Sequence, residues 1–270
     1  MTIQIQQLER ELGAALLERT TQGVRTTALG RQVKPAFERV LNDLDLASRS
    51  FREWVEGEAG LVTVAPLRSV AATVIPKALV RFQAAYPRIR VRLIDEVDPH
   101  IATMVARGEV DFGIATNEYV GEGVRFEEII QDHATAVMPP SHALARRRTV
   151  TLRSLLEEPL IVTETGLRRS LERAFASLGE VLYPAYETQY IPAIFAMVRA
   201  GLGVGILPLG MVESDSAQGV VWRRITHGAL TRQIGFLTRV GTAPSPAAER
   251  FLKTLRVVFR EMAQARKNSE

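Results

Sequence analysis

The 270-residue sequence contains no cysteine. This absence excludes thiolate catalysis, disulfide sensing and zinc sites built from cysteine, and it agrees with a reducing compartment. No apolar run approaches the roughly 18 residues that a membrane-spanning helix needs. The N-terminus also lacks the basic and apolar regions of a secretory signal peptide. We therefore expect a cytoplasmic protein with no membrane partner.

Motifs for catalysis and for metal binding are also missing. The sequence has no phosphate-binding loop, no G-x-S-x-G elbow and no kinase-like set. Its four histidines are scattered without metal-ligand spacing, which favours surface or helix-end positions. GLGVG at 201–205 resembles a dinucleotide fingerprint, but it follows a predicted helix and precedes a predicted strand, so a helix C-cap turn explains it better. We expect no enzymatic activity, no catalytic residue, no metal and no cofactor.

Charged residues gather in two short clusters. Asp95, Glu96 and Asp98 follow a predicted strand, and we interpret them as solvated loop charges because no histidine or second carboxylate motif stands with them. The run 146–148 is all arginine, and a solvated turn is the simplest interpretation. The net charge of +4 permits nucleic-acid binding but does not by itself indicate it.

The first 60 residues predict a helix, a hairpin and a long helix. Ile5, Leu8 and Leu12 repeat at helical spacing, and TTQGVRTT then predicts a two-stranded turn with Gly23 at its reversal. Thr27 is the expected N-cap of the next helix.

The long helix, predicted over 28–58, carries apolar residues in a narrow seam close to a heptad repeat. The seam consists of Leu29, Val33, Phe37, Val40, Leu44, Ala47, Phe51 and Trp54. Pro35 is expected to bend this helix or to mark its first turns. A single amphipathic helix on a core is one interpretation, but the length and the narrow seam favour pairing with another helix.

From Leu61 onward, predicted strands and helices alternate, which indicates an α/β fold with parallel strands and right-handed crossovers. Two such units follow one another in the sequence, and one further strand and helix come after them near the C-terminus. We therefore predict two lobes between which the chain crosses twice: lobe 1 at about 59–116 and 236–270, and lobe 2 at about 117–235.

Two predicted strand-to-helix turns, 66–70 and 163–166, are candidate ligand sites. In a parallel sheet, helix N-termini at such turns offer free N–H groups to a ligand. We expect Ser69 to cap its helix and Arg68 or Arg168 to supply a cation for a small, carboxylate-bearing molecule. The plainer interpretations, a helix cap for Ser69 and a solvated side chain for Arg168, stay open.

Taken together, these segments resemble a LysR-type transcriptional regulator over nearly the whole chain. IQQLERELGAALLERTTQGVRTTALG is similar to the family's recognition helix, wing and entry into the linker helix. GLVTVAP, FQAAYPRIRVRL, MVARGEVDFGIA, AGLGVGILP and SPAAERFL resemble its effector region. The resemblance implies an α/β chain: a remnant winged helix-turn-helix (1–27), a linker or dimerisation helix (28–58) and a two-lobe, periplasmic-binding-protein-like effector domain (59–270).

The resemblance also implies function and partners. It implies a small-molecule-responsive DNA-binding regulator that forms homodimers or homotetramers, with RNA polymerase as a further candidate partner. The absence of cysteine excludes a peroxide-sensing thiol in it. The implied effector contacts are Leu67, Arg68, Ser69, Val70, Thr116, Thr163, Glu164, Thr165, Gly166, Arg168, Tyr190, Ile191, Pro192 and Ala193. The implied operator-DNA contacts are Thr2, Gln4, Gln6, Gln7, Arg10 and Arg25, since glutamine can read adenine and arginine can meet phosphate.

The sequence departs from the family at its start, where roughly 30 residues of the helix-turn-helix are expected before Met1. A start codon assigned too late, an engineered truncation and natural decay all fit, and we favour the first. Ile3, Ile5, Leu8 and Leu12 would then lack their packing partners, and the chain as written should bind DNA weakly or not at all. The alternative function is a transporter's solute-binding protein, which would need an export signal and has no use for the N-terminal helix, hairpin and heptad seam.

Overall fold

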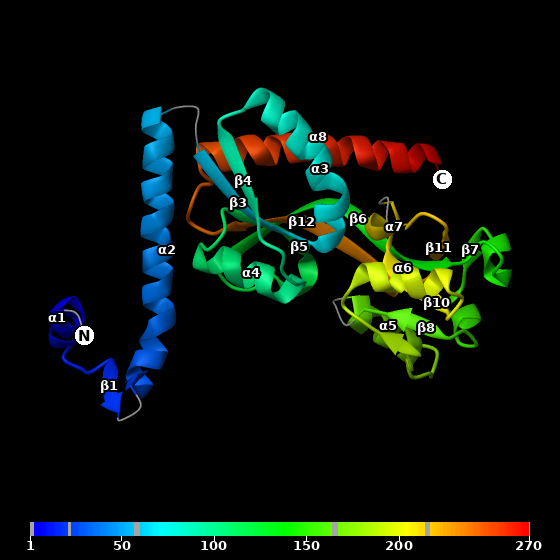
Figure 1. Ribbon diagram of the computed structural model, residues 1–270, viewed down its shortest axis with the longest axis horizontal. Helices are drawn as coiled ribbons and strands as arrows, with labels where there is room; N and C mark the ends of the chain where they lie inside the picture. Colours follow the sequence, from blue (N-terminus) through cyan, green and yellow to red (C-terminus); the bar gives the residue numbers. More distant parts are fainter. Residues whose placement is uncertain (1–2, 21–22, 57–59, 164–166, 214–216, 270) are drawn as a thin grey trace.

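The computed structural model describes residues 3–20, 23–56, 60–163, 167–213 and 217–269. The chain begins with helix α1 (Ile3–Leu12), the strands β1 (Leu17–Thr20) and β2 (Gly23–Thr26), and the long helix α2 (Ala28–Glu56). β1 and β2 pair as an antiparallel hairpin, so the predicted hairpin is confirmed. Figure 1 shows α2 standing beside the sheet, with α1 and the hairpin at its far end. Pro35 lies inside this continuous helix.

The hairpin is fastened to the start of α2 by close backbone contacts. The Thr27 hydroxyl accepts a hydrogen bond from the Gly30 amide and donates one to the Ala15 carbonyl, both at 2.9 Å, which confirms Thr27 as the N-cap. A Cβ atom on Gly30 would lie 2.2 Å from the Leu16 carbonyl oxygen, so only glycine fits there. These contacts join α1, the hairpin and α2 into one unit.

The following region contains strands and helices that build a sheet of ten strands in two halves. The first lobe contains β3 (Gly60–Pro66), α3 (Arg68–Ala85), β4 (Ile89–Leu93), α4 (Asp98–Arg107), β5 (Phe112–Thr116), the 3-10 turn η1 (Asn117–Tyr119) and the C-terminal helix α8 (Pro246–Ser269). The second lobe contains η2 (Ala143–Arg146), β7 (Thr149–Val150), η3 (Leu152–Leu155), β8 (Leu160–Val162), α5 (Leu167–Ala176), β9 (Tyr186–Glu187), α6 (Ile191–Arg199), β10 (Val204–Pro208), α7 (Leu209–Val212), β11 (Val221–Ile225) and η5 (Gly228–Leu230).

Two long antiparallel strands, β6 (Val124–Met138) and β12 (Thr231–Arg239), connect the lobes. The sheet order is β4-β3-β5-β12-β6-β10-β8-β9, with β11 also on β6 and β7 on β11. β6 pairs with β12 up to His133, then with β10 and β11 from Ala134 onward. The chain therefore crosses between the lobes through these two strands, while the exact lobe boundaries stay a prediction.

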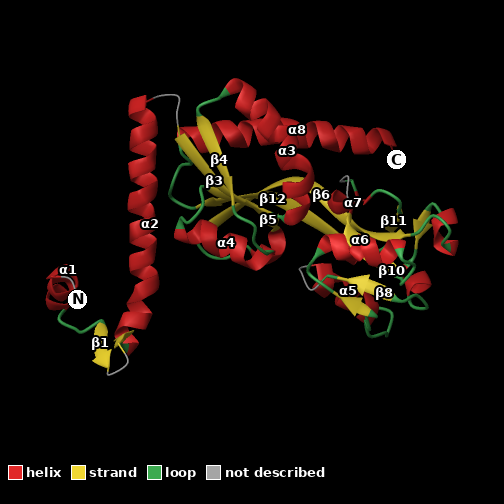
Figure 2. Ribbon diagram, viewed as in Figure 1, coloured by secondary structure: helices red, strands yellow, loops and turns green. Residues whose placement is uncertain are grey.

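Helices cover both faces of the first lobe's strands, with α3 and α8 on one face and α4 on the other (Figure 2). Phe82, Phe112, Phe236 and Phe251 form the centre of this core, and the Phe82 and Phe251 rings lie 4.8 Å apart. The second lobe has separate apolar clusters on the two faces of its strands.

The predicted start of the helix after β3 differs from the observed one. Helix α3 begins at Arg68, with Leu67 in the capping position and no side-chain cap bond, so the prediction of Ser69 as N-cap is wrong. The reason is that β3 continues through Pro66, which places Ser69 inside the first helical turn. At the start of η3, the Thr151 hydroxyl accepts a hydrogen bond from the Ser154 amide at 3.3 Å.

The predicted GLGVG turn is confirmed, because α6 ends at Arg199 and β10 begins at Val204. A Cβ atom on Gly203 would lie 2.1 Å from the Pro159 carbonyl oxygen. The prediction of surface or helix-end histidines is wrong for His133, which lies half-buried within β6.

The packing of α4 on β5 depends on the absence of a side chain at Gly113. A Cβ atom there would lie 2.5 Å from Cγ2 of Ile101 and 3.1 Å from Cγ2 of Val105. We expect Gly113→Ala to lower the free energy of unfolding by about 1–3 kcal/mol in urea titrations, because the overpacked helix must shift. The control is Gly121→Ala, where the added Cβ meets no atom within 4 Å. Equal stability of the two variants would contradict this packing.

Candidate functional site

The N-terminal helix presents the predicted DNA-reading residues on its surface. Gln4, Gln6, Gln7 and Arg10 are exposed on α1, and Arg25 is exposed on β2. Thr2 lies outside the described residues. The Glu9 carboxylate accepts from the amides of Leu16 and Leu17 at 2.7 and 2.9 Å, which anchors α1 on the hairpin.

The apolar side of α1 is only partly covered. Leu12 is 48% exposed, whereas Ile5 and Leu8 are half-buried, and the side chain of Ile3 is not among those described. Leu12 is thus the most exposed of the three described apolar side chains on this side of α1.

A second site lies between the lobes, where a narrow cavity of about 60 Å³ opens beside the start of α3. We call it the interlobe cavity. Its walls come from both lobes and from β12. They consist of Leu67, Arg68, Ser69, Glu96, Val97, Asp98, Thr163, Gln189, Ile191, Pro208, Met211 and Arg232. In this arrangement the cavity holds only a few water molecules. An organic ligand of ordinary size therefore requires the lobes to move apart.

The centre of this site is an ion pair between the two crossing strands. Arg232 of β12 donates to Oδ2 of Asp132 of β6 through Nε at 3.1 Å and Nη2 at 2.8 Å. Its Nη2 group also donates to the Ser69 hydroxyl at 3.2 Å. The Asp132 side chain is 1% exposed and that of Arg232 is 15% exposed. One guanidinium thus joins β6, β12 and α3.

Asp98 forms a second buried polar group in the cavity wall. Its carboxylate accepts from the Thr116 amide at 3.0 Å and from the Thr116 hydroxyl at 2.5 Å. Burial raises the pKa of Asp98 above its usual range, although the Thr116 hydrogen bonds and the Arg232 charge act in the opposite direction. The prediction of a solvated charge is therefore wrong for Asp98, because α4 starts there and packs its first turn against the end of β5.

The other two acids of that cluster lie at the rim. Asp95 is exposed and pairs with Arg68 at 3.3 Å. A hydrogen bond with His100 lowers the pKa of Glu96. Arg68 also donates to the Gln189 carbonyl at 3.1 Å, which is a direct contact across the cavity.

The structure brings only some of the predicted effector contacts together. Leu67, Arg68, Ser69, Thr163 and Ile191 line the interlobe cavity. Thr116 and Val70 are buried beside it, with Thr116 reaching it through Asp98. Residues 164–166 (Glu164, Thr165 and Gly166) lie outside the described residues.

The remaining predicted contacts point elsewhere. Arg168 pairs with Glu172 at 2.7 Å and with Glu187 at 2.8 Å, and its hydrogen bonds with Glu187 and then Glu172 raise the pKa of the guanidinium. Tyr190 is 67% exposed. Neither of these, nor Pro192 or Ala193, lines the cavity.

Sequence reasoning missed Asp98, Asp132 and Arg232. Asp132 and Arg232 stand as single charges inside strand segments rich in apolar residues, IIQDHATAVM and TRQIGFL. The sequence did carry a signal for this ion pair: the two segments that cross between the lobes bear opposite charges, and a charge buried in a strand needs a partner.

Within the described part of the chain, no three histidine, aspartate or glutamate side chains are grouped to hold a metal ion. No helix of that part is both long and apolar enough to cross a membrane.

Comparison with known proteins finds two regions of the chain that match family models. Residues 56–260 match the model of the LysR substrate binding domain, and residues 1–31 match that of the bacterial regulatory helix-turn-helix protein, lysR family. A relative from Escherichia coli, the uncharacterized HTH-type transcriptional regulator YbhD, is 26% identical over 94% of this chain and 81% of its own.

Two solved structures share the fold. Full-length CbnR in complex with target DNA has a TM-score of 0.66 and 21% identity, over 94% of this chain and 88% of its own. The effector binding domain of QuiR in complex with shikimate has a TM-score of 0.64 and 16% identity, over 75% of this chain and 98% of its own.

These findings favour a regulator over a transporter's solute-binding protein. The family-model match over residues 1–31 does not test whether further residues precede Met1, so the missing segment stays a prediction. The substrate-binding match covers most of the chain, and its position coincides with the two lobes of the sheet. The chain belongs to the LysR family of transcriptional regulators.

Proposed function

We propose that this regulator binds a small effector in the interlobe cavity and operator DNA through α1 and the hairpin. The observation that carries the proposal is the buried Arg232–Asp132 pair, which meets Ser69 of α3 where both crossing strands pass between the lobes. A ligand at this point touches both lobes and both connections. It can therefore favour one lobe arrangement over another, as a ligand with different affinities for two states does.

The polar groups of the cavity favour a small carboxylate that also bears hydroxyl or amino groups. Arg232 uses Nε and Nη2 in the bonds described above, which leaves Nη1 for a ligand carboxylate. The hydroxyls of Ser69 and Thr163 add donors and acceptors, and Asp98 adds a carboxyl group. Because Arg232 and Arg68 already have carboxylate partners, a multiply charged anion fits less well. Shikimate, which QuiR binds, is a suitable first probe.

The effector site is tested with Ser69→Ala. Thermal-shift and calorimetric titrations with shikimate and other small hydroxy and amino carboxylates identify a binding probe. We expect Ser69→Ala to weaken the affinity for that probe by about 10-fold, because a hydrogen bond to a charged group contributes about 1.5–3 kcal/mol.

The control for this experiment is Thr63→Val, which removes a buried hydroxyl without a hydrogen-bond partner, away from the cavity. It should leave the affinity unchanged. Full affinity in Ser69→Ala would place the effector elsewhere.

Strand β12 connects the interlobe cavity to α2, the predicted linker helix. Arg232 lies near its start, and Arg239 at its end pairs with Asp43 of α2. The pairing of β12 with β6 shifts register between Ile234 and Gly235, so the strand is irregular between its two arginines. We infer that lobe movement displaces α2, and with it the DNA-binding end, through this strand.

This coupling predicts that Asp43→Asn separates ligand binding from the response of α2. Hydrogen–deuterium exchange over residues 28–56 should change when the probe binds to the wild-type chain and should change much less in Asp43→Asn at equal saturation. Arg256→Gln, which removes a comparable surface pair with Glu127 at 2.8 Å, is the control and should respond like the wild type. An unchanged response in Asp43→Asn would refute the route.

The exposed apolar side of α2 is proposed to pair with α2 of a second copy. Val40, Leu41 and Leu44 are each more than 60% exposed, which is unfavourable for an isolated helix in water. We expect Leu44→Glu to shift the chain toward monomer in sedimentation velocity experiments. Arg39→Glu, which places the same charge on a position already polar, should not. Equal association of both variants would exclude this surface.

A further inference from the structure

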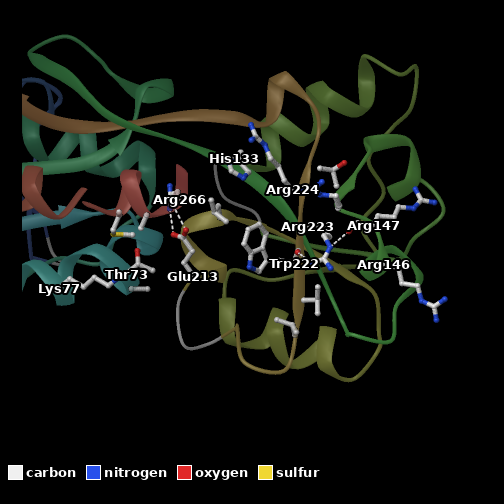
Figure 3. A pocket seen from close by; sticks show the side chains of 18 of the residues that line it. Thr73, Lys77, His133, Arg146, Arg147, Glu213, Trp222, Arg223, Arg224 and Arg266 are labelled. Carbon is white, nitrogen blue, oxygen red and sulfur yellow. Dashed lines mark hydrogen bonds and ion pairs between the residues drawn. The ribbon is translucent and has the colours of Figure 1, made fainter. Parts of the chain in front are cut away.

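A second hollow, far larger than the interlobe cavity, lies on the molecule and shares no lining residue with it. Its volume is about 1270 Å³. Its walls come from α3, α7 and α8 on one side and from β11 and the segment between η2 and β7 on the other, so it spans both lobes. We call it the basic groove and define it by Lys77, Arg147, Glu213, Trp222, Arg223 and Arg266 (Figure 3).

Positive charge is concentrated in the basic groove. Seven arginine and lysine side chains line it against a single carboxylate, that of Glu213. Arg266 already binds that carboxylate through two hydrogen bonds of 2.9 and 2.6 Å. The whole chain has a net charge of only +4, so the groove holds a larger positive excess than the protein. A hollow of one charge sign concentrates ligands of the opposite sign.

Backbone groups hold Arg223 in place without neutralising its charge. Arg223 donates to the backbone carbonyls of Arg147, Trp222 and Ala145. Carbonyl groups orient a guanidinium without removing its charge. Among the described residues, no carboxylate forms an ion pair with Arg147, Arg148 or Lys77. The interlobe cavity is different, because Arg232 has Asp132 there.

The residue types point to phosphate and to an aromatic group. Six of the seven cations are arginine, whose planar fork binds phosphate through paired hydrogen bonds. Trp222 of β11 is 38% exposed in the groove, and in Figure 3 it lies between the Arg266–Glu213 pair and Arg223. An exposed indole ring is a stacking surface for a nucleobase. Because the arginine and lysine side chains line the walls of one hollow, a compact polyanion can contact several of them at once.

We propose that the basic groove binds a nucleoside polyphosphate, with its phosphates on Arg147, Arg148 and Arg223 and its base on Trp222. Because Arg266 of α8 and Glu213 after α7 join the two lobes, phosphates in the groove compete with Glu213 for Arg266. The nucleotide thus acts on the lobe arrangement from a surface separate from the effector cavity.

The test is calorimetric titration of the full chain with ATP, tripolyphosphate and adenosine at near-physiological ionic strength. ATP is expected to bind with 1:1 stoichiometry. Arg147→Gln and Arg148→Gln are each expected to lower the affinity for ATP by about 10-fold, because each removes a charged hydrogen-bond donor. Trp222→Leu should lower the affinity for ATP but leave the affinity for tripolyphosphate unchanged. The control, Arg153→Gln, changes an exposed arginine outside the groove and should have no effect.

Three results would overturn the proposal. The first is no ATP binding by the wild-type chain. The second is an equal loss in Arg153→Gln, which would indicate unspecific attraction by surface charge. The third is saturation of the groove by duplex DNA or an acidic peptide, but not by ATP, with sensitivity to the same arginine variants. Circular dichroism melts of each variant separate a lost site from a lost fold.

Discussion

The buried ion pair between Arg232 and Asp132 is the constraint on which the lobe arrangement depends. Both residues lie on the only two strands that connect the lobes in the described structure, and Arg232 also holds Ser69 at the start of α3. Removing one partner of such a pair costs about 3–5 kcal/mol, since the other charge is left buried and unpaired. The pair therefore holds β6, β12 and the start of α3 together at the point where the chain crosses between the lobes.

The interlobe cavity and the basic groove differ in how far carboxylates balance the charge of their arginine and lysine side chains. In the interlobe cavity each arginine has a carboxylate partner, and the buried Asp98 carries a raised pKa. Such a site selects a ligand by matching a few donors and acceptors in a small space. In the basic groove Arg147, Arg148 and Lys77 have no carboxylate partner among the described residues and line a large open volume, so attraction of anions dominates. Both hollows contact the two lobes. The interlobe cavity suits a ligand that matches its few donors and acceptors, whereas the basic groove attracts anions by its charge.

Local sequence signals predicted the local structure well. The hairpin at Gly23, the Thr27 cap and the GLGVG turn each depend on residues close together in the chain, and the structure confirms all three. The buried charges were not predictable in that way. Asp98 is buried by the contact between α4 and β5, and Arg232 meets a partner 100 residues away. The Ser69 cap was wrong because the length of β3 decides where α3 begins, and the local pattern does not fix it.

The most direct test of this account is a double-mutant cycle on Asp132 and Arg232 with leucine at each position. Both the free energy of unfolding and the affinity for the effector probe should be measured for the two single variants and the double variant. The account predicts that each single variant is strongly destabilised, that the double variant recovers much of the loss, and that effector binding is lost whenever Arg232 is replaced. Additive destabilisation, together with effector binding that survives without Arg232, would contradict it.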